Sequence, residues 1–98
     1  MSQDARPLLV FFTSSTSGPA RRMESLLAHL ARKERERLRV MSVDVGRQPE
    51  LAARFRVDTV PTLVLIKEKR AVGRIEGRAS APRIEAMLES HLAAPAAA

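Results

Sequence analysis

Three short and strongly apolar runs, each about the length of a β-strand, constrain the fold of this chain more than any other feature. The run at 6–13, "RPLLVFFT", is continuous in the way that is typical of a strand covered on both faces. The run at 38–45 is rich in β-branched residues, and the run at 62–66 is again continuous. Because the segments between them are long enough for helices, the runs predict parallel pairing through right-handed helical crossovers.

Helical patterns separate the apolar runs. Over residues 20–31 apolar positions recur at three- and four-residue spacing, which predicts an amphipathic helix with Ser17 as its N-cap and Pro19 in its first turn. A second, short helix is expected at 46–55, and a terminal helix begins after Ser80. The methionines that fit core or helix-stripe positions are Met23, Met41 and Met87.

The last part of the sheet is predicted to be a hairpin. A charged turn at 67–70 leads into residues 71–77, where glycines interrupt the alternation and indicate an edge strand or a bulge. The whole order is β-α-β-α-β-β-α, which predicts an α/β fold with a mixed four-stranded sheet and helices on both faces. With 98 residues, the chain fits a single domain over 1–92 followed by a disordered tail at 93–98.

The chain is basic, with a net charge of +6, so binding to nucleic acid or another polyanion has to be considered. The basic residues are scattered and often alternate with acidic ones, as in the segment 31–39. Tyr and Trp are absent and the three Phe residues lie in apolar contexts, which argues against a base-stacking platform. These features argue against nucleic acid as the partner, and they leave a polyanion-binding arginine surface as an alternative function.

Cysteine is absent from the chain, so disulfides, thiolate catalysis and cysteine metal sites are excluded. The apolar run near the N-terminus holds five consecutive apolar residues, fewer than the roughly 7–15 of a signal peptide. No stretch approaches the ~20 apolar residues of a membrane span. We therefore expect a cytoplasmic protein that has no membrane partner, no cofactor and no metal.

Four stretches, taken in order, resemble the thioredoxin family. The segment 7–23 resembles the strand, loop and helix of its active site, and 40–57 resembles its next strand and helix. The segment 59–77 resembles its cis-proline strand and hairpin, and 80–92 its closing helix. The resemblance implies a minimal thioredoxin-like fold over 6–92, in which an additional N-terminal strand and helix of the family have no counterpart.

The resemblance also implies that the redox site has been dismantled. The attacking cysteine of the family falls on Ser17 and the resolving cysteine on Ala20, while the preceding tryptophan falls on Thr16. The buried aspartate that assists proton transfer falls on Phe11, and the lysine that often accompanies it falls on Ser42. Because the relay is lost together with the thiols, the chain is interpreted as a natural, redox-inactive member rather than an engineered cysteine knockout.

Two recognition features of the family remain, and they define the predicted binding site. The resemblance implies a cis bond before Pro61 and a backbone beside it that pairs with an extended polypeptide, which needs no cysteine. The predicted site combines the former active-site loop with this proline edge, and its residues are Thr16, Ser17, Gly18, Pro19, Ala20, Arg21, Val60, Pro61 and Thr62. This predicts a non-enzymatic adaptor that binds an unidentified polypeptide and is itself a monomer or a weak dimer. The competing interpretation is that Pro61 only shapes its loop.

The start of the first long helix offers two alternatives. Ser17 could act as a nucleophile, but a helical 17–29 places His29 about 18 Å away along the axis, so N-capping is favoured. The free N–H groups of the helix, with Arg21 and Arg22 in its first turn, could instead bind a small anion. No catalytic residue is assigned.

Overall fold

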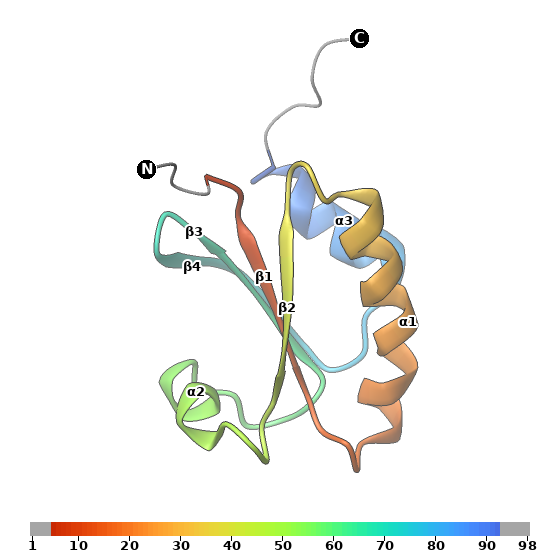
Figure 1. Cartoon of the computed structure of the whole chain (residues 1–98), viewed down its shortest axis with the longest axis vertical. Coiled ribbons are helices and arrows are strands. Elements are labelled where there is room, and N and C mark those ends of the chain that lie inside the picture. Colours follow the sequence, from red (N-terminus) through yellow and green to blue (C-terminus); the bar gives the residue numbers. More distant parts are fainter. Residues whose placement is uncertain (1–4, 93–98) are drawn as a thin grey trace, which may run out of the picture.

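The computed structural model describes residues 5–92, and the predicted order of strands and helices is confirmed. The elements are β1 (Leu8–Thr13), α1 (Gly18–Lys33), β2 (Arg39–Asp44), α2 (Pro49–Arg54), β3 (Thr62–Lys67), β4 (Arg70–Glu76) and α3 (Ala81–Glu89), as drawn in Figure 1. The predicted tail at 93–98 lies outside the described residues. Within residues 5–92, no helix has the length and apolarity that crossing a membrane requires.

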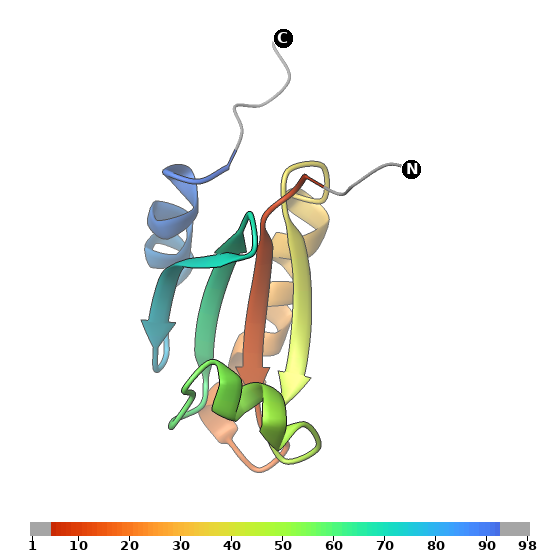
Figure 2. The same ribbon diagram turned by 90° about the vertical axis from the view of Figure 1, so that its left-hand side faces the viewer.

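The four strands form one mixed sheet in the order β2-β1-β3-β4. β1 runs parallel to β2, and β3 runs antiparallel to both β1 and β4. The parallel pairing predicted from the two helical crossovers is therefore confirmed for β1 and β2 and wrong for β3. The six-residue α2 is too short to carry the chain back along the sheet, so β3 starts at the end of the sheet where β2 ends (Figure 1). Figure 2 shows α1 and α3 on one side of the sheet and α2 on the other. The predicted α/β architecture with helices on both faces is therefore confirmed, and the two central strands are covered on both faces as their continuous apolar runs predicted.

Each face of the sheet has its own apolar core. Alternate residues of β1 point to opposite faces, so Leu9 and Phe11 join the core under α1 and α3, whereas Val10 and Phe12 join the core under α2. The first core is the larger and takes the buried side chains of α1 and α3. The second core is completed by Val43 and Val64, with half-buried Phe55 at the end of α2 tilted against Phe12 at a ring distance of 5.7 Å.

The hairpin between β3 and β4 is tighter than the sequence pattern predicted. The expected turn at 67–70 reduces to Glu68 and Lys69, whose φ angles of 53° and 66° suit a two-residue turn between antiparallel strands. The predicted bulge is present, because the register shifts beside Leu65 and Ile66. β4 is at the same time an edge of the sheet, as expected.

The prediction that Met41 is a core residue is wrong. Met41 lies in β2 at the other edge of the sheet, and 39% of it is exposed to solvent. By strand alternation it shares a face with Val43, which is buried under α2. The six-residue α2 packs near the C-terminal end of β2 (Figure 1), so it covers Val43 and leaves Met41 uncovered.

Candidate functional site

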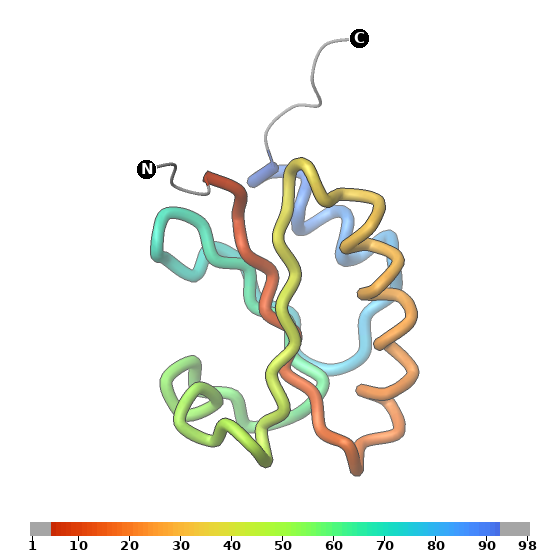
Figure 3. The backbone as a smooth tube through the Cα atoms, viewed as in Figure 1, coloured from red at the N-terminus to blue at the C-terminus, as the bar shows by residue number. Residues whose placement is uncertain are grey.

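The pairing of β1 with β3 brings the two halves of the predicted site together. Phe12, next to the end of β1, lies opposite Thr62, the first residue of β3. Because the strands are antiparallel, the loop 14–17 that leaves β1 and the segment 57–61 that enters β3 lie at the same end of the sheet (Figure 3). The two segments that the sequence singled out are thus neighbours in space.

The loop 14–17 is held by its own polar groups. Ser17 N donates to the Ser14 carbonyl oxygen at 3.1 Å, which closes a turn. The hydroxyl oxygens of Ser14 and Thr16 are hydrogen-bonded at 2.9 Å, and Thr16 N donates to Ser14 Oγ at 3.3 Å. The hydroxyl groups of Ser14 and Thr16 therefore order the loop.

Ser17 is the N-cap of α1, as predicted. Its Oγ accepts a hydrogen bond from Ala20 N at 3.1 Å, and its carbonyl oxygen accepts one from Arg21 N at 3.0 Å. Pro19 has no N–H group, so few donors of the helix N-terminus remain for an anion. His29 lies in a groove beside α3, so it provides no base for Ser17.

The peptide bond between Val60 and Pro61 is cis, as the family resemblance implied. The carbonyl oxygen of Pro61 accepts a hydrogen bond from Gly77 N at 2.8 Å, which ties this bend to the end of β4. Thr62 Oγ1 donates to the carbonyl oxygen of Thr59 at 2.7 Å. No partner within residues 5–92 satisfies the backbone N–H and C=O of Val60.

The predicted site residues differ in what they can offer a partner. The side chains of Ala20, Pro61 and Thr62 are buried, so these three residues pack beneath the surface of the site and are not accessible to a partner. Ser17 and Val60 are half-buried. The exposed members are Thr16, Gly18, Pro19 and Arg21. The accessible surface is therefore made by the loop, the first turn of α1 and the backbone at Val60.

A shallow depression beside Pro19 extends this surface, and sequence reasoning did not find it. It has a volume of about 380 Å³ and is lined by Pro19, Arg22, Met23, Leu26, Arg78, Ala79 and Ser80. Arg22 and Arg78 give it a basic rim, and the guanidinium of Arg22 folds back toward Gly18. In the sequence, Arg22 in the first turn of α1 was a partial indication of this basic depression. Arg78 could not be found in the same way, because only the packing of α1 against the loop before α3 brings it close to Arg22.

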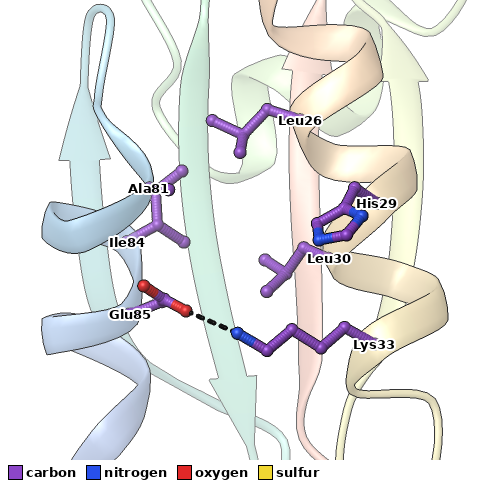
Figure 4. A pocket seen from close by; sticks show the side chains of 7 residues that line it. All are labelled: Leu26, His29, Leu30, Lys33, Ala81, Ile84 and Glu85. Carbon is purple, nitrogen blue, oxygen red and sulfur yellow. Dashed lines mark hydrogen bonds and ion pairs between the residues drawn. The ribbon is translucent and has the colours of Figure 1, made fainter.

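A second groove lies between α1 and α3, away from the loop 14–17. Figure 4 shows its apolar floor of Leu26, Leu30 and Ile84, with an ion pair of 3.0 Å between Lys33 and Glu85 at one end. Its volume is about 250 Å³. Among the residues from 5 to 92, no three His, Asp or Glu side chains lie close enough to hold a metal ion.

Comparison with known proteins supports the identification that the geometry suggests. Residues 1–90 match the family pattern described as thioredoxin. The chain is 30% identical over 84 residues to a thioredoxin-like protein of Synechocystis, covering 86% of this chain and 80% of that protein. It is 31% identical over 86 residues to thioredoxin of Alicyclobacillus acidocaldarius, with coverages of 88% and 82%.

Solved structures agree with this assignment. The germline-specific thioredoxin Deadhead of Drosophila melanogaster superimposes with a TM-score of 0.83 at 28% identity, covering 90% of this chain and 83% of that one. The thioredoxin NaTrxh of Nicotiana alata gives a TM-score of 0.85 at 25% identity, with coverages of 93% and 77%. The cis-proline, the helix capped by Ser17 and the matched sequence lead to one conclusion: this chain, which has no cysteine, belongs to the thioredoxin family.

Proposed function

We propose that this protein is a redox-inactive member of the thioredoxin family that acts as an adaptor and binds an extended segment of another polypeptide. The observation that carries the proposal is the pairing of Phe12 with Thr62, which keeps the loop and the cis-proline side by side in a chain without thiols. Thiol–disulfide exchange needs an attacking thiolate, and neither Ser17 nor Ala20 supplies one.

The backbone at Val60 provides the attachment for the segment. Its N–H and C=O have no partner within residues 5–92, while the next carbonyl, on Pro61, is already bonded to Gly77. An extended polypeptide can pair with such free groups as an added strand, and pockets beside it then select side chains. A buried cis-proline and a fully buried Thr62 hold these backbone groups in a fixed position.

The depression rimmed by Arg22 and Arg78 sets the chemistry of the segment. Its apolar floor and two guanidinium groups suit an apolar side chain next to an acidic one, because guanidinium pairs well with carboxylate. Arg21 adds a third positive charge in the first turn of α1, where there is no acidic residue to offset it. We therefore expect acidic peptides to be preferred over basic ones.

The test is an array of short unstructured peptides of varied charge, probed with the wild-type protein and with the double variant Arg22→Glu, Arg78→Glu. The expected result is selective retention of acidic peptides, with an affinity about tenfold weaker in the variant because two charge contacts become repulsive. The matched control is Arg54→Glu, an exposed position on α2 at the other face of the sheet, which should bind as the wild type does.

Two outcomes would contradict the proposal. Turnover of insulin disulfides by the wild-type protein would show redox activity. Equal retention on heparin by all variants, with a steep dependence on salt and no preference among peptides, would assign binding to the arginine-rich surface as a whole. A substitution at Thr62 is unsuitable as a test, because its buried side chain would disturb the fold before it disturbed binding.

A further inference from the structure

The two edges of the sheet are built differently. β4 is protected against pairing with another strand by a register shift and by the charged side chains of Arg70, Arg74 and Glu76. β2 has none of these features over residues 40–43, whose sequence is VMSV. Figure 1 shows β2 in front of the sheet with no described element over its outer edge. An unprotected edge of this kind is a template for strand addition.

The register of β2 identifies the backbone groups that face outward. Arg39 N donates to the carbonyl oxygen of Pro7 at 2.9 Å, and Val45 N donates to that of Thr13 at 3.0 Å. In a parallel ladder, alternate residues bond to the same neighbour, so the odd-numbered residues of β2 bond to β1. Val40 and Ser42 therefore direct their N–H and C=O groups away from the sheet.

We propose that a second copy of this chain occupies this edge, with β2 paired antiparallel to β2 about a two-fold axis at Met41. In this register Val40 forms a hydrogen-bonded pair with Ser42 of the partner subunit, and Ser42 does so with Val40 of the partner subunit. All the outward groups of both residues are then satisfied. The two sheets become one continuous sheet, joined by an isologous interface.

The interface covers the apolar surface that the monomer leaves in water. Met41 is the exposed large apolar side chain of the described residues, and in this register it lies beside Met41 of the partner subunit. On the other face, Leu26 and Leu30 of α1 point toward α3 in Figure 4, so helical geometry places Ala28 and Ala31 on the flank toward β2.

The register sets the antiparallel direction of pairing, because it joins the outward N–H and C=O groups of Val40 to those of Ser42 of the partner subunit. The net charge of +6 on each copy opposes association, and salt screens this repulsion with a Debye length of about 8 Å at physiological ionic strength. Dimerisation should therefore strengthen as salt is added, whereas binding of acidic peptides weakens.

A chain without cysteine allows a direct test by single-cysteine cross-linking. In the proposed register the Cα atoms of two Cys residues at position 41 are about 4.5 Å apart, within disulfide range. Two Cys residues at position 42 are diagonal neighbours at about 7–8 Å, which is too far. We expect Met41→Cys to form a disulfide-linked dimer in a glutathione buffer about tenfold faster than Ser42→Cys. Equal, slow cross-linking of both variants, or faster cross-linking of Ser42→Cys, would overturn the proposal.

Sedimentation equilibrium provides a second, independent measurement. Ser42→Pro removes an outward N–H group and no hydrogen bond to β1, so the edge strand should keep its place in the sheet. The dimer dissociation constant should rise by about thirtyfold, since one hydrogen bond of ~1 kcal/mol is lost from each copy. Ser42→Ala is the matched control and should dimerise as the wild type does. A wild-type protein that stays monomeric at high salt would overturn the proposal. If Ser42→Pro fails to fold, the cross-linking rates of Met41→Cys and Ser42→Cys decide between the proposed register and its rejection.

Discussion

Thr62 Oγ1 donates a hydrogen bond of 2.7 Å to the carbonyl oxygen of Thr59, two residues before the cis-proline. Thr13, the other buried threonine, has an Oγ1 with no hydrogen-bond partner among the described residues. We predict opposite effects of the same substitution. Thr62→Val should lower the free energy of unfolding by about 1–2 kcal/mol because a buried acceptor loses its donor, whereas Thr13→Val should be neutral or stabilising. Urea denaturation of both variants provides the measurement. Equal destabilisation by the two substitutions would contradict the prediction.

Ser17 should contribute to stability as a helix cap. Ser17→Ala removes the acceptor for Ala20 N and should lower the free energy of unfolding by about 1 kcal/mol. Ser17→Asp keeps an acceptor at this position, so it should retain most of the stabilisation by the cap. Ser80 caps α3 through a longer contact of 3.4 Å to Arg83 N, so Ser80→Ala is expected to cost less. Denaturant titration of the three variants would measure these differences. A larger loss at Ser80 than at Ser17 would contradict this ranking of the caps.

The loop should accept a redox pair, because the helix start behind it and the cis-proline beside it are both present. The double variant Ser17→Cys, Ala20→Cys places one thiol at the N-cap and one in the first turn of α1, where the helix dipole lowers a thiol pKa. With dithiothreitol as the reductant, we expect it to catalyse insulin reduction, during which its two thiols become a disulfide and are regenerated. The wild-type protein and Ser17→Cys alone should show no turnover. A double variant that folds but lacks activity would show that the loop has lost the required geometry.

Gly73 in β4 lies against Met87 of α3. A Cβ atom added at Gly73 would come within 2.8 Å of Met87 Sδ and 2.9 Å of its Cγ, closer than packed atoms allow. Gly73→Ala should therefore lower the free energy of unfolding by about 1–3 kcal/mol through overpacking. The control is the double variant Gly73→Ala, Met87→Ala, in which the penalty of the alanine at Gly73 should vanish. If the changes in the free energy of unfolding caused by the two substitutions were simply additive in thermal unfolding, overpacking against Met87 would be ruled out as the cause.

The turn between β3 and β4 carries avoidable strain. Glu68 and Lys69 both have positive φ angles, which cost a residue other than glycine or asparagine about 1 kcal/mol each. The double variant Glu68→Asn, Lys69→Gly should raise the midpoint of thermal unfolding, since this pair is preferred in two-residue hairpin turns. The matched control is Lys67→Gly, at the last residue of β3, which should lower the midpoint of thermal unfolding.

Local patterns were sufficient for most of the fold. The continuous apolar run of β1 predicted a strand covered on both faces, and Ser17 with Pro19 predicted the start of α1 to within a residue or two. The positive φ angles at Glu68 and Lys69 left no such signal, because neither residue is typical of a turn that needs them. The turn was therefore predicted too long.

By itself, the sequence determined the order of the elements, the absence of thiol chemistry and the two segments that form the candidate site. Each of these depends on residue type or on spacing along the chain, which are local properties. The tertiary structure decided what lies on the surface. It buried Thr62, brought Arg78 to Arg22 across the helix packing, and left Met41 exposed at the edge of the sheet. Exposure depends on which elements pack over a residue, and the apolar residues of β2 did not distinguish Val43, which α2 covers, from Met41, which it does not.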